Sequence, residues 1–221
     1  MSKDLSVRLA KIRACIPESV RLIAVSKTFP VSIIRAAYAE GIRDFAENKV
    51  QESLSKQAEL SDLTDVTWHF IGHIQSNKSR KVVENFDWIH SVDSLKLANR
   101  LDRQAAELGR YPNCCLQVKL LPDPNKDGFE VDELMAALPD LDQLSHLNIC
   151  GLMVILPYGL PPFESAAGFE KARDLARQIN QSGMIRARMV ELSMGMSGDF
   201  EVAIAAGATM VRIGSGLFGA R

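Results

Sequence analysis

One lysine, Lys27, stands where its amine could do chemistry. It ends the segment LIAVSK (22–27), whose first five residues are mostly apolar and predict a buried strand. Burial disfavours the charged form of a lysine and leaves a neutral amine that can attack a carbonyl group to give a Schiff base. The alternative is a lysine whose ammonium reaches solvent from the end of the strand. Position alone leaves both interpretations open.

Two segments rich in glycine and serine could bind an anion. SMGMSGD (193–199) and RIGSG (212–216) each follow or end an apolar segment late in the chain. Glycine lets backbone N–H groups approach an anion closely, and the hydroxyls of Ser193 and Ser215 could add donors. Arg212 would point into the same space. A reactive lysine that faces a phosphate-binding loop predicts a pocket for pyridoxal 5′-phosphate.

The elements that must position these residues follow from a regular alternation along the chain. Short apolar or β-branched segments predict eight strands, at 22–26, 42–46, 67–72, 88–92, 114–119, 151–156, 189–193 and 210–213. Segments with helical spacing lie between them, and a further helix is predicted at 4–15. Alternating strands and helices indicate a parallel sheet. We therefore predict an α/β fold, a single (β/α)8 TIM-like barrel domain over 1–221 with an extra N-terminal helix. An open doubly wound sheet is the alternative.

A barrel of this kind gathers its chemistry at the carboxyl ends of its strands. Polar residues concentrate at the predicted ends, whereas the strands themselves are largely apolar. They include Lys27, Asn48, His73, Lys119, Tyr158, Ser193, Arg212, Gly214 and Ser215.

Seven segments, in order, carry a resemblance to a known family. They are LIAVSK (22–27), FAENKVQE (45–52), WHFIGHIQSNK (68–78), IHSVDS (89–94), GLM (151–153), LSMGMSGDFEVAIAAGAT (192–209) and VRIGSGLFGAR (211–221). Each is weak by itself, but together they span nearly the whole chain. The chain resembles the pyridoxal-phosphate homeostasis proteins, a family similar to the N-terminal barrel of alanine racemase.

The resemblance implies a set of cofactor-binding residues and no catalytic or metal-binding ones. It implies that Lys27 forms an aldimine with the cofactor and that Arg212 contacts the pyridine nitrogen. The remaining positions resemble residues that bind the phosphate, namely Ser193, Gly214 and Ser215, and one that lines the ring, Asn48. The family usually has an asparagine on the fifth strand where this chain has Lys119.

The predicted function follows from the arginine and from the length of the chain. A charged guanidinium beside the ring nitrogen disfavours its protonation and makes the ring a weaker electron sink. Alanine racemase adds a second domain with a catalytic tyrosine, whereas this sequence ends at Arg221, and of its three tyrosines only Tyr158 is expected near the mouth of the barrel. We expect a protein of vitamin B6 and amino-acid homeostasis that holds the cofactor without catalysis. A racemase or related enzyme is the alternative, and apo-enzymes that use the cofactor are candidate partners.

Composition excludes several other functions. The net charge of −1 argues against nucleic acid and anionic membranes as partners. The charged N-terminus lacks a secretion signal, and the apolar segments are too short to span a bilayer, so we expect a cytoplasmic protein. Without an exposed apolar stripe, we expect a monomer. Because residues four apart in a strand lie about 13 Å apart, we do not expect His69 and His73 to share a metal. Cys114 and Cys115 are expected on opposite faces of one strand.

Overall fold

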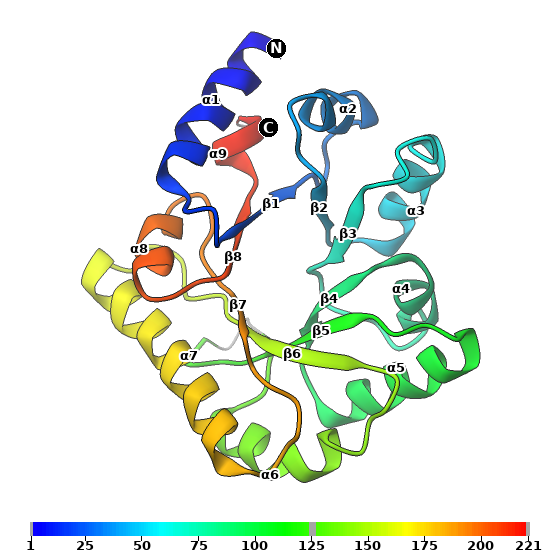
Figure 1. The fold of residues 1–221 in the computed structure, drawn as a ribbon, viewed down its shortest axis with the longest axis vertical. Helices are drawn as coiled ribbons and strands as arrows, with labels where there is room; N and C mark the ends of the chain where they lie inside the picture. Colours follow the sequence, from blue (N-terminus) through cyan, green and yellow to red (C-terminus); the bar gives the residue numbers. More distant parts are fainter. Residues whose placement is uncertain (1, 124–126, 220–221) are drawn as a thin grey trace.

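Eight parallel strands close into a barrel in sequence order, with β8 paired to β1. The computed structural model describes residues 2–123 and 127–219 (Figure 1). The strands are β1 (Arg21–Val25), β2 (Asp44–Glu47), β3 (Thr67–Phe70), β4 (Trp88–Val92), β5 (Asn113–Gln117), β6 (Asn148–Met153), β7 (Glu191–Ser193) and β8 (Met210–Ile213). The predicted barrel is confirmed, and the open doubly wound sheet is wrong.

Helices surround the barrel and alternate with its strands (Figure 1). Those after β1 to β7 are α2 (Val31–Ala39), α3 (Val50–Glu59), α4 (Ser79–Asn85), α5 (Leu95–Leu108), α6 (Val131–Leu141), α7 (Pro162–Ser182) and α8 (Phe200–Ala205). Two more lie at the ends of the chain, α1 (Ser2–Cys15) before β1 and α9 (Ser215–Phe218) after β8. The extra N-terminal helix is therefore confirmed. Within the described ranges, no helix has the length and apolar character needed to cross a bilayer.

Apolar side chains form two layers, because alternate residues of a strand point to opposite faces of the sheet. The outer layer packs between strands and helices and includes Phe45, Phe70 and Leu116. The inner layer fills the barrel with Ile23, Val25, Ala46, Trp88, Cys115, Met153 and Met210. Cys114 lies in the outer layer and Cys115 in the inner one, as predicted.

Strand β5 is shorter than predicted, and Lys119 does not end it. The chain folds back after β5, so that Phe129 N donates to Gln117 O at 2.8 Å and Lys119 N donates to Phe129 O at 2.9 Å. Gly128 permits this return with a φ of +136°. Lys119 Nζ lies 2.6 Å from Glu130 Oε1, at the beginning of α6. The Lys119 side chain is therefore held by Glu130.

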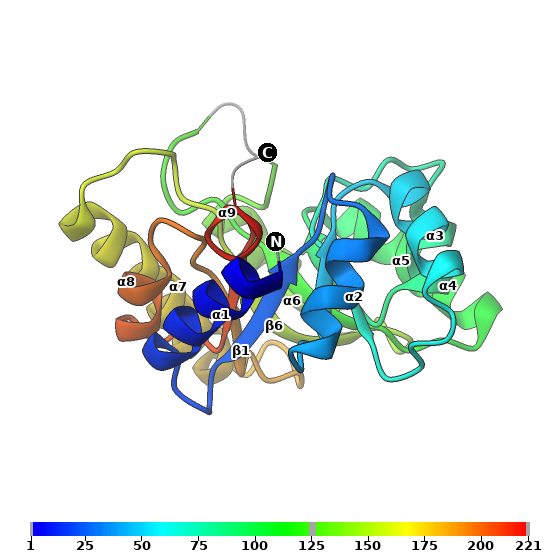
Figure 2. The ribbon, with the colours of Figure 1, turned by 90° about the horizontal axis from the view of Figure 1, so that it is seen from above.

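The first and last helices pack against each other. Figure 2 shows α1 and α9 side by side, and Arg8 Nε donates to Leu217 O at 2.7 Å. The rings of Phe29 and Phe218 also pack, with centroids 5.1 Å apart. These contacts fix the segment that follows Gly214 against the loop that follows Lys27.

Candidate functional site at the carboxyl end of the barrel

Lys27 and Asn48 lie just beyond β1 and β2, next to each other in the barrel. Val25 pairs with Ala46, both side chains belong to the inner layer, and Ser26 N donates to Ala46 O at 3.0 Å. Lys27 and Asn48 each follow two residues later, so the alternation of the strands brings both to the inner side. Both side chains are partly buried.

Asn48 presents an unsatisfied acceptor. Its Oδ1 is buried and has no hydrogen-bond partner within the described part of the chain. The backbone of Asn48 is closely packed, because a Cβ added at Gly72 would lie 2.1 Å from Asn48 O. Only glycine therefore fits at position 72, and this close contact fixes the backbone of Asn48.

Arg212 is a buried cation inside the barrel. It lies on β8 opposite Ile23, and only 3% of its surface is exposed. Its Nη1 donates to Ser193 Oγ at 2.7 Å and its Nη2 to Val154 O at 2.9 Å. Burial lowers the pKa of Arg212 to about 10, which leaves the guanidinium charged at neutral pH. Because both partners are neutral oxygens, the positive charge can still attract an electron-rich group of a ligand.

A chain of buried polar side chains runs from Arg212 across the barrel. Ser193 Oγ lies 2.8 Å from His90 Nδ1, and His90 Nε2 lies 2.9 Å from His69 Nδ1. His69 Nε2 lies 3.0 Å from Asp44 Oδ1, at the amino-terminal end of β2. Desolvation lowers the pKa of both histidines, and that of His90 falls well below its ordinary value. Both imidazoles are therefore neutral at neutral pH.

Neutral imidazoles give this chain of hydrogen bonds one direction. The Asp44 carboxylate can only accept, so His69 Nε2 carries its proton and His69 Nδ1 accepts from His90 Nε2. His90 Nδ1 then accepts from the Ser193 hydroxyl. That hydroxyl in turn accepts from the guanidinium of Arg212, which has no acceptor atom. The donors thus run from Arg212 to Asp44, and the Ser193 proton is directed to His90.

The glycine-rich segments meet at the rim of the barrel. Ser197 Oγ accepts from Gly214 N at 3.3 Å and from Gly216 N at 3.1 Å, so two backbone donors converge on one oxygen. Ser215 is exposed beside them. Ser193 is completely buried and bonded to Arg212 and His90, so its role toward phosphate stays a prediction. Ser197 is not among the phosphate-binding residues predicted from the sequence.

Another polar cluster lies after β3 and β4. His73 Nδ1 is 3.1 Å from Asp127 Oδ2 and 3.4 Å from Asp93 Oδ2, and these groups are arranged as metal ligands could be. His69 belongs to the buried chain that contains Asp44 and shares no ligand group with His73. That His69 and His73 share no metal stays a prediction.

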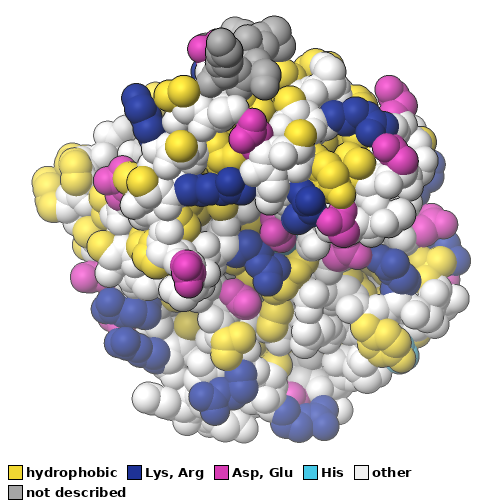
Figure 3. Space-filling view, turned by 45° about the horizontal axis from the view of Figure 1, so that its top comes forward, with side chains coloured by type: hydrophobic (Ala, Val, Ile, Leu, Met, Phe, Trp, Pro, Cys, Tyr) yellow, Lys and Arg dark blue, Asp and Glu magenta, His cyan; other side chains and the backbone are white. Residues whose placement is uncertain are grey.

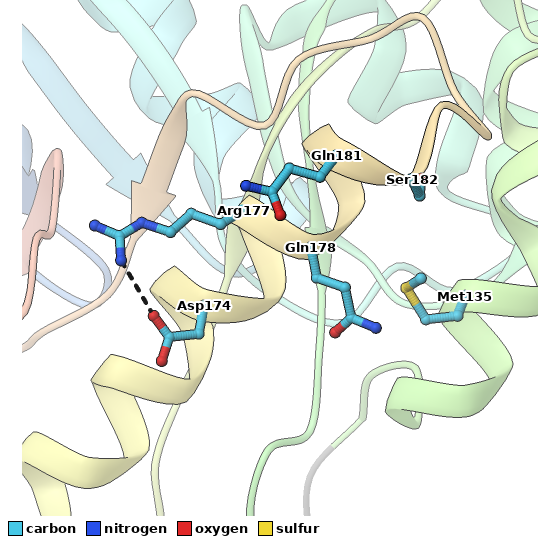
Figure 4. A pocket seen from close by; sticks show the side chains of 6 residues that line it. All are labelled: Met135, Asp174, Arg177, Gln178, Gln181 and Ser182. Atoms are coloured by element: carbon cyan, nitrogen blue, oxygen red, sulfur yellow. Dashed lines mark hydrogen bonds and ion pairs between the residues drawn. The ribbon is translucent and has the colours of Figure 1, made fainter.

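Other features of the surface do not form part of the site. Tyr158, the tyrosine nearest to the expected mouth by sequence, has its side chain fully exposed. A hollow of about 500 Å³ lies between α6 and α7, where Met135 faces Gln178 and Arg177 pairs with Asp174 (Figure 4). It is lined by none of the predicted site residues. On the face shown in Figure 3, basic and acidic side chains are interspersed, without a large area of one sign.

Comparisons with known proteins agree on one family. Residues 2–221 match the family described as alanine racemase, N-terminal domain. The chain is 54% identical over 212 residues to a pyridoxal phosphate homeostasis protein of Synechocystis sp., and the match covers 96% of each protein. It is 44% identical over 211 residues to the protein of the same name from Escherichia coli K12, covering 93% of this chain and 87% of that protein.

Solved structures give the same result. PipY of Synechococcus elongatus with pyridoxal phosphate bound has a TM-score of 0.93 and 56% identity, over 97% of this chain and 100% of that one. An alanine racemase of Clostridium difficile 630 has a TM-score of 0.76 at 15% identity, over 99% of this chain and 57% of that one. The second likeness shows the barrel fold alone.

Proposed function

Because this chain belongs to the pyridoxal phosphate homeostasis proteins of the alanine racemase N-terminal domain family, we propose that it binds pyridoxal 5′-phosphate at the carboxyl end of its barrel. The proposal rests on three groups that the alternation of the neighbouring strands β1, β2 and β8 assigns to the inner side of the barrel. These are the Lys27 amine after β1, the unpaired oxygen of Asn48 after β2 and the buried guanidinium of Arg212 on β8.

The chemistry of these donors and acceptors fits the cofactor. An unpaired buried oxygen such as Asn48 Oδ1 costs about 1–3 kcal/mol, which a ligand that supplies a donor would offset. The Arg212 guanidinium suits the pyridine nitrogen, which is an acceptor when unprotonated. The N–H groups of Gly214 and Gly216 already converge on a hydroxyl oxygen and suit a phosphate oxygen. Ser215 and Ser193 are the further predicted phosphate contacts.

Lys27 is the residue that we propose captures the cofactor. Its amine attacks the aldehyde carbon, and loss of one water molecule leaves an aldimine. When bound, the cofactor supplies this aldehyde and a ring able to withdraw electrons. Hydrolysis by one water molecule releases it again, which suits a protein that stores or delivers a cofactor.

A role in vitamin B6 and amino-acid homeostasis, rather than catalysis, is the function that these features favour. Arg212 is charged and buried, so it opposes protonation of the ring nitrogen by like-charge repulsion. An unprotonated ring stabilises carbanions less well, and carbanions are the intermediates of racemisation. The relatives of this chain carry the name of homeostasis proteins. Apo-enzymes that use the cofactor remain the proposed recipients.

Trapping with borohydride tests the binding site. We expect the purified protein to take up pyridoxal 5′-phosphate with a visible absorption band, and reduction to fix the cofactor on the peptide that contains Lys27. Peptide mapping by mass spectrometry gives the position. Label found instead on Lys49 or Lys119 would overturn the assignment, and absence of any uptake would overturn the proposed function.

Release and turnover separate a carrier from an enzyme. Contacts between a phosphate group and its donors are open to competition by free phosphate, so we expect inorganic phosphate to accelerate loss of the cofactor during dialysis. We also expect no racemisation of alanine, serine or glutamate above the rate of free cofactor. Absorbance of the retained cofactor and chiral chromatography give the two measurements. Catalytic racemisation would establish the alternative function.

A further inference from the structure

The main chain on both sides of Lys27 is held by two side chains of helix α3. Lys56 Nζ donates to Ser26 O at 2.9 Å, and Thr28 N donates to Glu52 Oε1 at 2.5 Å. Lys56 and Glu52 also pair with each other at 2.7 Å, four residues apart on the helix. Lys27 thus lies between two points that one ion pair fixes.

This ion pair is part of a buried cluster. Lys56 is only 6% exposed, and its ammonium donates to Ser26 O, Glu52 Oε1 and Glu47 Oε1, the last at 2.8 Å. Glu47 is completely buried and also accepts from Ser26 Oγ at 2.6 Å. Burial of such charges is costly, and apolar residues of similar size are often at least as stable. Stability is therefore a poor reason for the cluster, and its contacts point to the loop that carries Lys27.

The backbone conformation of Thr28 must be stabilised by contacts of this kind. Its φ of +68° is unique among the non-glycine residues that the structure describes. This region is strongly disfavoured for a β-branched side chain, so the surrounding structure must impose it. The turn is closed by a bond from Phe29 N to Ser26 O at 3.0 Å, and the bond from Thr28 N to Glu52 is the side-chain contact that acts directly on this peptide. A relaxed Thr28 would rotate the chain next to Lys27 and change the direction of its side chain.

We propose that Glu52 and Lys56 are positioning residues that aim the Lys27 amine at the aldehyde, an inference that rests on the proposed function. The pair holds Ser26 and Thr28, keeps the strained turn at Thr28, and so sets the angle at which the amine leaves β1. Neither residue reacts with the cofactor. Their loss should weaken covalent capture much more than it weakens non-covalent binding.

Two related compounds separate these effects. Pyridoxal 5′-phosphate has an aldehyde that Lys27 can capture, whereas pyridoxamine 5′-phosphate has the same ring and phosphate but no aldehyde. In Glu52→Ala, we expect the affinity for the aldehyde to fall about tenfold, the scale of one lost hydrogen bond to a charged group. We expect the affinity for the amine compound to change less than about twofold, because no part of the proposed ring and phosphate site is altered. Glu84→Ala, an exposed glutamate on α4, is the matched control and should change neither.

A second substitution distinguishes aiming from a general loosening of α3. Glycine adopts positive φ readily, so Thr28→Gly removes the strain that Glu52 must hold. In the Glu52→Ala background, we expect Thr28→Gly to raise the affinity for the aldehyde by about threefold or more. A threefold gain recovers about half of the free energy that a tenfold loss of affinity represents. Loosening of the helix would not be repaired by a change at Thr28.

The outcomes distinguish an error in the positioning role from an error in the proposed function. Normal uptake by Glu52→Ala, or an equal loss of both compounds, overturns the positioning role and leaves the proposed function standing. Failure of Thr28→Gly to restore capture also overturns it. If the wild-type protein binds neither compound, the proposed function is wrong and this inference falls with it.

Discussion

Replacement of Lys27 with alanine is expected to abolish covalent uptake of pyridoxal 5′-phosphate. The variant keeps Arg212, Asn48 and the N–H groups of Gly214 and Gly216, none of which forms a hydrogen bond with Lys27. It loses the amine that we propose attacks the aldehyde. We therefore expect no borohydride-trapped product and no visible absorption band, while pyridoxamine 5′-phosphate still binds within about threefold of its wild-type affinity.

Lys49→Ala is the matched control for this prediction. Lys49 is the exposed residue next to Asn48 and lies close to the proposed site, but on the outside of the barrel. The Lys49→Ala variant should give as much borohydride-trapped product as the wild type. The thermal unfolding of Lys27→Ala should also stay close to that of the wild type, because the Lys27 side chain is only partly buried. A trapped product in Lys27→Ala would assign the amine to another lysine.

The barrel could be predicted because its strands are buried on both faces. Such strands consist of nearly continuous apolar residues, and LIAVS, CCLQ and MVRI stand out from the helical segments between them. The end of strand β5 could not be predicted in this way. Its apolar segment continues to Val118, but Phe129 returns from eleven residues further on and bonds to Gln117 and Lys119. Nothing in the local sequence indicates that return.

The candidate site could be predicted in part for a geometric reason. Lys27, Asn48, Gly214 and Ser215 follow strands directly, and in a barrel all strand ends of one kind lie together. His90 could not be found this way, because it lies within an apolar strand and meets Ser193 across 103 residues. The closure of the barrel creates that contact, and local spacing carries no sign of it.

The contacts of α3 with the residues beside Lys27 could not be predicted, for a different reason. Glu52 and Lys56 are four residues apart on a polar helix, which is the usual pattern of an exposed ion pair. Only the structure shows that Lys56 turns inward to Ser26 O and Glu47. The residues that hold Lys27 in place therefore look ordinary in the sequence, whereas Lys27 itself does not.

The two buried histidines are expected to make the protein lose stability steeply as the pH falls. His69 faces Asp44, Arg21 and Asp87, and His90 faces His69, Arg212 and Arg21. Desolvation is the largest cause for both and lowers their pKa values in the folded state. An unfolded chain has histidines with a pKa near 6.5. Below that pH the unfolded state binds more protons than the folded state, so folding becomes less favourable.

The direction and size of the change in stability with pH follow from this difference in proton binding. Stability is fully present above about pH 6.5 and declines as the pH falls toward the folded-state pKa values. Each histidine that stays neutral in the folded protein contributes a slope of up to about 1.4 kcal/mol per pH unit, so the pair contributes up to about 2.7. Burial raises the pKa of Glu47, which acts in the opposite direction at lower pH. A comparison of variants that all retain Glu47 removes its contribution.

His90→Gln isolates one of the two slopes. We expect the variant to be less stable at pH 7 by about 1–3 kcal/mol, because one amide cannot replace both hydrogen bonds of the ring. Between about pH 6.5 and pH 5, its unfolding free energy should decline by about 1.4 kcal/mol per pH unit less than that of the wild type. Urea unfolding at a series of pH values gives the slopes, and His146→Gln, on the outside of the barrel, is the control. Equal slopes in the wild type and His90→Gln would mean that His90 already takes up its proton in the folded barrel. The direction of hydrogen bonds from Arg212 to Asp44 would then not hold in this acidic range, because a protonated His90 could not accept from Ser193.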